Sequence, residues 1–156
     1  MNADLAYLLG MLHDGHISFR DNRVIVEFYQ QNTGILQYLQ QILERRYNYR
    51  PRITKHRGAY RLRVFKKEIS SLIANLSRNT DFRKIPWSIA KYFVAGYIDA
   101  EGCLLIDREY TRIVVTQADK EDLLRLSELI EENTEINCTK IQGPYAHKMS
   151  KKRCIT

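Results

Sequence analysis

The sequence predicts an α+β fold built from two pseudo-symmetric αββαββ(α) repeats within one domain, spanning about residues 1–84 and about 85–156. Two observations predict it. The order of helical and strand-like segments starts again near the middle of the chain, and short stretches recur at a nearly constant offset. The length of 156 residues and the hydrophobic content of 44% suit a single globular unit with a real core.

The recurring stretches support a tandem duplication. "TKHRGAY" at 54–60 and "TKIQGPY" at 139–145 share Thr, Lys, Gly and Tyr at an offset of 85 residues. Gln117 follows Gln30 by 87 residues, and Glu101 follows Asp14 by the same 87 residues. A tandem duplicate that folds as one unit implies a pseudo-two-fold axis between its copies.

In the first copy, residues 4–14 (DLAYLLGMLHD) predict a nearly all-apolar, buried helix with Asp4 as its N-cap and Gly15 ending it. The other elements follow from alternation and helical periodicity. They are a hairpin over 16–20 and 23–30, an amphipathic helix over 34–47, a hairpin over 50–56 and 59–66, a short helix over 66–76 and a linker over 77–84.

The second copy repeats this order but stops about one helix short. A helix beginning near Pro86 runs through Glu101, and Gly102 ends it. The remaining predicted elements are a hairpin over 103–107 and 112–117, an amphipathic helix over 120–132, and a strand over 136–141 that opens another hairpin before a basic tail.

The charge balance favours a polyanionic partner. Lys and Arg number 25 against 18 Asp and Glu, which leaves a formal net charge of +7. Nucleic acid or an anionic membrane surface would fit this charge. No apolar run approaches the roughly 18 residues of a membrane span and no signal-peptide pattern opens the chain, so we expect an intracellular protein. Three widely spaced cysteines without a CxxC pair predict incidental thiols rather than disulfides or zinc.

The two apolar helices each carry small residues on one face and an acid near the C-terminal end. Ala6 and Gly10 lie four residues apart, as do Gly96 and Ala100, so the helices can pack closely at the axis. Parallel packing would bring Asp14 and Glu101 within a few ångströms of each other. Two carboxylates so close need a cation, and oxygen-only ligands suit Mg²⁺.

The alternative is that both acids are simply solvated residues at helix ends. The helix dipole disfavours a carboxylate at a helix C-terminus, so an acid at the matching position of both copies argues against that alternative.

"VAGYIDAEG" (94–102) resembles the signature motif of the LAGLIDADG homing endonucleases, which it matches at Ala95, Gly96, Ile98, Asp99, Ala100 and Gly102. The resemblance implies motif helices paired at the axis, antiparallel sheets that form a DNA-binding saddle, and catalytic, metal-binding roles for Asp14 and Glu101. The first motif departs from the pattern, because Leu9 occupies the usual glycine position and Leu12 stands where Asp99 does. Asp99 therefore has no counterpart, and we expect it to be a structural group rather than a metal ligand.

The resemblance also implies roles for residues around the acids. Gln30 and Gln117 would orient water near the metals, although an amide at a strand end could instead cap the next helix. Lys84 would stabilise phosphoryl charge. His13 and His16 form an HxxH pair that is a weak zinc signal, and a contact with a base edge or phosphate is the favoured role.

Alternation along the strands separates an inward face from an outward one. Leu62, Val64, Ile53, Ile17 and Phe19 are predicted to point inward. The outward residues of the first copy, which predict a major-groove reader, are His16, Ser18, Arg20, Arg50, Arg52, Thr54, His56, Arg61 and Arg63. The faces of the second copy are ambiguous, and the candidates there are Thr139, Lys140 and Gln142. The alternative is a basic face that only confers solubility.

Together these features predict a site-specific homing endonuclease that makes a metal-dependent double-strand break in a long asymmetric DNA target. We expect two or three Mg²⁺ ions, with Mn²⁺ or Ca²⁺ able to substitute in binding, and a monomer, because the duplication supplies both halves of the interface. The competing interpretations are an RNA-binding intron maturase on the same fold, a DNA-binding regulator without cleavage, and a basic protein-interaction module.

Overall fold

The computed structural model describes residues 1–21, 23–106, 111–139 and 141. The chain divides into two compact units, Met1–Ala100 and Glu101–Thr156, and each is described by itself. Within the described ranges, no helix has both the length and the apolar character needed to cross a membrane.

The first helix, α1 (Ala3–Gly10), begins one residue earlier than predicted and has a different cap. Asn2 is the N-cap, and its side chain accepts a hydrogen bond of 3.1 Å from the Leu5 amide. The prediction of Asp4 as the cap is wrong, because Asp4 already lies inside the first turn. Its carboxylate instead binds Arg45 and Arg46 of α2, at 2.7 Å each.

The predicted helix over 4–14 also changes its geometry part-way. It is α-helical only to Gly10, and Met11–Asp14 form a tighter 3₁₀ turn, η1. Gly15 then opens the first strand rather than closing the helix. The position of Asp14 is therefore set by a 3₁₀ turn.

The first unit contains the predicted four-stranded antiparallel sheet. Its strands are β1 (Gly15–Arg20), β2 (Arg23–Gln30), β3 (Ile53–His56) and β4 (Ala59–Val64), in the order β1-β2-β4-β3. β3 starts three residues later than predicted. Pro51 has no amide hydrogen to donate to a ladder, which explains why pairing begins only at Ile53.

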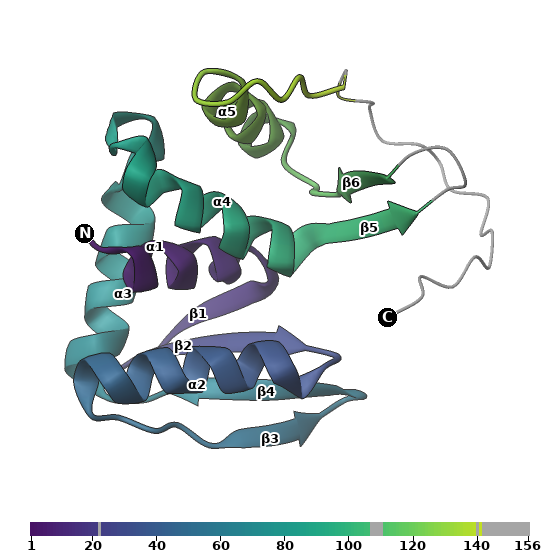
Figure 1. Cartoon of the computed structure of the whole chain (residues 1–156). Coiled ribbons are helices and arrows are strands. Elements are labelled where there is room, and N and C mark those ends of the chain that lie inside the picture. The colour runs from purple at the N-terminus through teal and green to yellow at the C-terminus, as the bar shows by residue number, and fades with distance from the viewer. Residues whose placement is uncertain (22, 107–110, 140, 142–156) are drawn as a thin grey trace. The chain divides into compact units, whose positions relative to one another are not determined.

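Two amphipathic helices supply much of the core beneath this sheet. α2 (Thr33–Tyr47) lies along β2 and β4, and α3 (Lys67–Asn79) packs against β2 and α1 (Figure 1). α3 is three residues longer than predicted at its C-terminal end, and the connection that follows includes a 3₁₀ turn, η2 (Phe82–Lys84). Many of the fully buried core side chains come from the strands and from these helices, namely Val26, Phe28, Leu36, Leu39, Ile42, Leu43, Leu62, Val64 and Ile73. Leu8 of α1 and Met11 of η1 are also fully buried.

The second motif helix, α4 (Trp87–Glu101), ends where the sequence predicts. The second unit continues from Glu101 with the hairpin β5 (Gly102–Ile106) and β6 (Thr111–Val115), followed by α5 (Lys120–Glu131). The predicted αββα order of the second repeat is thus confirmed as far as α5.

The strand predicted over 136–141 does not form in its described part, residues 136–139 and 141. Side chains near the end of α5 satisfy the alternate backbone amides that a ladder would use. Thr134 Oγ1 accepts from the Ile136 amide at 3.1 Å, and Glu131 Oε1 accepts from the Cys138 amide at 2.8 Å. Local capping therefore replaces strand pairing here. Cys138 is a free thiol among the described residues, and Cys154 lies outside them.

Candidate functional site

The two motif helices meet at their glycines, as the small-residue pattern predicts. A Cβ atom on Gly10 would lie 2.7 Å from the Tyr97 amide nitrogen and would overlap the Phe93 carbonyl oxygen. A Cβ on Gly96 would lie 3.1 Å from the Met11 amide nitrogen. The backbones of α1 and α4 are therefore in direct contact, and no larger residue fits at either position.

A second contact joins the same two helices. The Tyr7 hydroxyl donates a hydrogen bond of 2.5 Å to Asp99 Oδ2, across 92 residues of sequence. Burial, followed by the hydrogen bond to Asp99 and its charge, raises the pKa of Tyr7, so the hydroxyl keeps its proton at all physiological pH values. Asp99 thus hydrogen-bonds one motif helix to the other, as expected for a structural group.

Asp14 ends η1 with a polar neighbour from the adjacent strand. Gln30, the last residue of β2, donates from Nε2 to Asp14 Oδ2 at 3.2 Å. Partial burial of the carboxyl raises the pKa of Asp14, although the residue as a whole remains exposed. Among the described residues, no basic side chain contributes to that shift. The site is therefore a desolvated carboxylate that would gain from a bound cation.

The second repeat places its candidate residues at the same ladder positions. Gly15 pairs with Phe28 in the first hairpin, and Gly102 pairs with Val115 in the second, so both partners are shifted by 87 residues. In each hairpin the candidate acid directly precedes the glycine, and the candidate glutamine comes two residues after the glycine's partner. The 87-residue offset found in the sequence therefore means that the two hairpins pair their strands in the same register.

In the second unit, the Thr116 amide donates to the Glu101 carbonyl at 3.3 Å, which extends the ladder beside the acid. Gln117 Oε1 accepts from the Ala118 amide at 2.6 Å. The N-cap of α5 is Asp119, so Gln117 does not cap that helix but holds the turn that precedes it.

The two acids also lie at similar distances along their helices from the contact glycines. Asp14 follows Gly10 by four residues, and Glu101 follows Gly96 by five. Four residues of 3₁₀ helix advance about 8 Å at about 2.0 Å each, and five of α-helix advance about 7.5 Å at about 1.5 Å each. The 3₁₀ turn of the first motif thus compensates for its missing residue.

The other polar candidates are less closely tied to the acids. Lys84 lies in η2 and contacts Asp81 at 3.7 Å, with its own side chain 84% exposed. The His13 ring packs against the Tyr97 ring, with their centroids 3.9 Å apart, and His16 is exposed on β1. Within the described residues, no three His, Cys, Asp or Glu side chains gather to hold a metal ion, so the HxxH pair has no zinc partners there.

The outward face of the first sheet is largely as predicted. Leu62 and Val64 are fully buried and Ile53 and Ile17 pack against the core, whereas Phe19 is 55% exposed beneath the Arg78 guanidinium. The predicted outward residues that are exposed are His16, Arg20, Arg50, Arg52 and Thr54, and those that are half-buried are Ser18, His56, Arg61 and Arg63. In the second unit Thr139 is exposed, while Lys140 and Gln142 lie outside the described residues.

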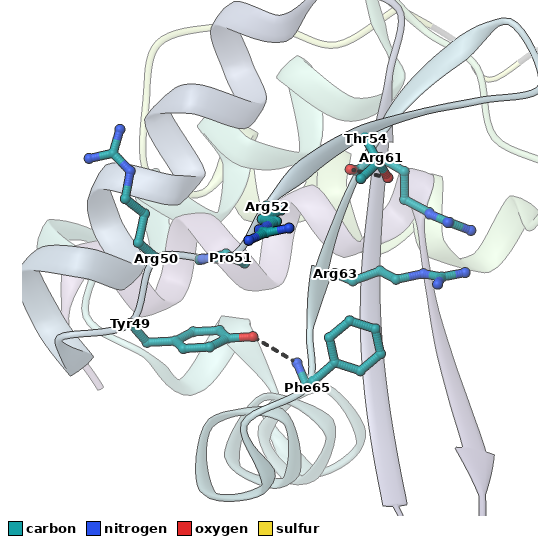
Figure 2. Close-up of a pocket in the computed structure, with 8 residues that line it drawn as sticks. All are labelled: Tyr49, Arg50, Pro51, Arg52, Thr54, Arg61, Arg63 and Phe65. Carbon is teal, nitrogen blue, oxygen red and sulfur yellow. Dashed lines mark hydrogen bonds between the residues drawn. The ribbon is translucent and has the colours of Figure 1, made fainter.

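A hollow of about 350 Å³ opens on this face beside β3 and β4. Figure 2 shows its lining of four arginines (Arg50, Arg52, Arg61 and Arg63) with Tyr49, Phe65, Pro51 and Thr54. The Phe65 amide donates to the Tyr49 hydroxyl at 3.1 Å, which fixes one wall, and Arg50 turns away to bind Glu44 at 2.8 Å. A basic hollow with aromatic walls suits a phosphate or an exposed base.

Sequence reasoning missed one residue of this face, Glu27. It lies on β2, opposite Arg63 in register and 8% exposed. Its Oε1 accepts from Arg63 Nε at 2.5 Å and lies 3.5 Å from an Arg61 terminal nitrogen. Arg61 and Arg63 are therefore paired side chains. Alternation alone could have placed Glu27 on the outward face, but not its partners on β4.

The family comparison agrees with these observations. Residues 88–151 match the model of a LAGLIDADG-like domain. The second repeat of the chain is thus similar to a LAGLIDADG-like domain. The resemblance seen in the second motif is thereby confirmed.

Proteins similar to this chain include the homing endonuclease I-ApeI of Aeropyrum pernix, which is 26% identical over 146 residues. That alignment covers 81% of this chain but 64% of I-ApeI, so the chain spans less than two thirds of this relative's length.

The fold is shared with solved homing endonucleases. Variants of I-DmoI superpose with a TM-score of 0.65 at 22% identity, covering 83% of this chain and 76% of theirs. I-WcaI bound to its DNA recognition sequence superposes with a TM-score of 0.61 at 15% identity, covering 88% of this chain and 70% of its own. Other I-DmoI structures contain target DNA with Ca or Mn.

Proposed function

We propose that this LAGLIDADG chain is a site-specific homing endonuclease that needs a divalent metal and cuts both strands of a long asymmetric DNA target. The observation that carries the proposal is the repeated placement of an acid, a glycine and a glutamine at the same register of two hairpins. The names of its relatives, homing endonucleases that bind target DNA, support the same activity.

The residues present fit Mg²⁺. Asp14 offers carboxylate oxygen, and partial burial raises its pKa without an opposing basic neighbour among the described residues. Mg²⁺ keeps several waters and is commonly held by one or two carboxylates plus substrate phosphates, so it does not need a cage of protein ligands. I-DmoI, which has a similar fold, has been crystallised with DNA and Ca, Mn or Mg, and this supports the choice of a divalent ion.

In the proposed mechanism, Asp14 and Glu101 each ligate a divalent ion. The bound metal would activate water and stabilise charge at the scissile phosphate. Gln30, through its amide on Asp14 Oδ2, holds the carboxylate in one orientation. Gln117 serves the matching position of the second repeat, and Lys84 supplies positive charge to the phosphoryl group.

The target would be bound by the outward sheet faces. Arginines fork to guanine in the major groove, and a β-ribbon fits that groove. The two copies differ in their outward residues, so each would read a different half-site and a monomer would suffice. Because the proposed substrate is cellular DNA, the proposal also places the chain inside the cell.

The test is to incubate the full chain with duplex DNA that carries candidate intron-insertion junctions, with Mg²⁺, Mn²⁺, Ca²⁺ or EDTA. We expect cleavage of both strands in Mg²⁺ or Mn²⁺, and binding without cleavage in Ca²⁺. Asp14→Asn and Glu101→Gln should each abolish double-strand cutting and retain binding. Glu68→Gln, an exposed acid on α3, is the matched control and should cut normally.

Full cleavage by the Asp14→Asn protein would remove Asp14 from the mechanism. Binding to duplex DNA without cutting in any metal would instead identify a DNA-binding regulator. Preferential binding to structured intron RNA, again without cutting, would identify a maturase.

A further inference from the structure

The outward face of the first sheet is strongly basic, yet a carboxylate lies at its centre. Glu27 occupies the middle of β2, between His16 of β1 and Arg63 of β4 in register. Only 8% of the residue is exposed. A buried acid on a surface proposed to bind polyanionic DNA lowers the attraction for phosphate, so its presence calls for a different role.

Glu27 holds two arginines with one oxygen. Its Oε1 accepts from Arg63 Nε at 2.5 Å and lies 3.5 Å from a terminal nitrogen of Arg61. Burial alone would raise the pKa of Glu27, but the hydrogen bond from Arg63 and the charges of both arginines hold it below its ordinary value. The carboxyl is therefore ionised whenever the protein meets DNA.

The geometry divides the work between the arginines. The Arg63 side chain is 38% exposed, and because Nε is used by Glu27, its two terminal amino groups remain for an outside acceptor. The Arg61 side chain is 13% exposed, and within the described part of the chain its buried Nε has no hydrogen-bond partner. Arg61 and Arg63 extend to the same side of β4 (Figure 2).

We propose that Glu27 is a positioning residue for DNA recognition: it orders Arg63 before DNA arrives and thereby sets sequence specificity in the half-site read by the first copy. This inference rests on the proposed endonuclease function. An ordered arginine loses less side-chain entropy on forming a bidentate contact with guanine. The negative charge of Glu27 also weakens contacts with DNA of any sequence, target and non-target alike, so its effect on the ratio of the two affinities passes through Arg63.

The chain contains a matched control for this arrangement. Asp4 likewise binds two arginines, Arg45 and Arg46, with a side chain 14% exposed against 11% for Glu27. It lies at the start of α1 and bonds α2, away from the outward sheet face. Asp4→Asn therefore removes one carboxylate charge from an equivalent ion pair without touching the proposed reader.

The experiment uses the full chain and targets selected by it from a randomised duplex library in Ca²⁺. For each variant, the affinity for the selected target is divided by the affinity for an unrelated duplex of the same length. Glu27→Gln keeps the shape and one acceptor but removes the charge. We expect it to lower this ratio roughly tenfold, with tighter binding to the unrelated duplex and relaxed selection at one or two base pairs.

Asp4→Asn should lower stability comparably and leave the ratio unchanged. In an Arg63→Ala background, Glu27→Gln should have no further effect on the ratio, because the residue it positions is gone. Arg63→Lys keeps the charge but lacks Nε, and should relax selection at the same base pairs. An unchanged ratio in Glu27→Gln, or an undiminished effect in the Arg63→Ala background, would overturn the proposal.

A measurement on the free protein tests the positioning step separately. The Nε proton of Arg63 should exchange slowly with solvent by NMR in the wild-type chain and quickly in Glu27→Gln. Fast exchange in the wild type would overturn the inference even if DNA binding is normal. A wild-type chain that selects no duplex but shows slow exchange would refute the proposed function and the specificity role, leaving only the ordered ion pair.

Discussion

Asp14, the proposed metal ligand of the first motif, is a carboxylate whose charged form is disfavoured by partial burial. Gln30 donates a hydrogen bond to it, and no basic side chain in the described part of the chain contributes to its titration. Partial desolvation disfavours its charged form and raises its pKa. A partly buried carboxylate whose charge no cation balances is typical of a functional site. A bound metal ion would supply the missing positive charge.

The pH dependence of Asp14→Asn follows from that shift. Because the pKa of Asp14 is higher in the folded chain than in the unfolded chain, ionisation above the folded value destabilises the native state. In metal-free buffer at pH 7, the substitution should raise the free energy of unfolding by a few tenths of a kcal/mol, a small gain because the residue is exposed. At pH 3, below the unfolded value of about 3.9, the gain should vanish.

Urea denaturation of both proteins at the two pH values measures this difference. An equal gain at pH 7 and pH 3 would show that the effect is not electrostatic.

At the scale of elements, the contact between α1 and α4 depends on two glycines. The backbones are close enough that a methyl group at Gly10 or Gly96 would meet main-chain atoms of the other helix. The 3₁₀ turn after Gly10 then restores the spacing to Asp14 that the shorter first motif lacks. The rise per residue and the position of the interhelical contact together determine how far each acid lies from that contact along its helix.

Replacing Gly96 with Ala tests this contact. In an ordinary helix interior the change stabilises by about 0.5–1 kcal/mol. Here the new Cβ would lie 3.1 Å from the Met11 amide nitrogen and overlap the Tyr7 carbonyl oxygen, so we expect destabilisation of about 1–3 kcal/mol. Equilibrium unfolding in urea gives the value.

Gly34→Ala is the control for the same substitution. Gly34 lies in the first turn of α2, where the nearest atom to a new Cβ is Asn32 Oδ1 at 3.3 Å. The free energy of unfolding of the Gly34→Ala protein should differ from the wild-type value by no more than a few tenths of a kcal/mol. Similar losses at both positions would mean that the interhelical contact is looser than described.

At the scale of the whole molecule, net charge and its placement govern how the chain would meet DNA. The formal charge is +7, and the outward face of the first sheet concentrates arginine. These arginines differ in their partners. Arg63 and Arg61 are held by Glu27, whereas exposed Arg52 has no ion pair or side-chain hydrogen bond within the described ranges. Arg52 is therefore the better candidate for a phosphate contact.

Binding should weaken steeply with salt, because each neutralised phosphate releases counterions. Arg52→Ala should reduce the slope of log K against log salt by about 0.9 and weaken all duplexes about equally. Arg45→Ala, which removes an exposed arginine bound to Asp4, should leave the slope unchanged. Titrations of a fluorescent duplex from 50 to 200 mM salt give these slopes, and an affinity that is flat over this range would contradict the basic interface.

Periodicity in the sequence was enough to predict the repeated αββα order and the inward face of the first sheet. These features depend on periodicity and on spacing within one repeat, which are local. The 87-residue offset is visible in the sequence, and the strand pairing in the structure shows that both hairpins have the same register.

Contacts between residues far apart in the chain could be identified only from the tertiary structure. It placed Asp4 against α2 rather than at a helix cap, joined Tyr7 to Asp99, and set Glu27 between two arginines. It also satisfied the amides of Ile136 and Cys138 with side chains of the preceding turn, so no strand forms over 136–139. A buried charge or an amide takes whichever partner the fold brings within hydrogen-bond distance, and periodicity along the chain carries no information about that partner.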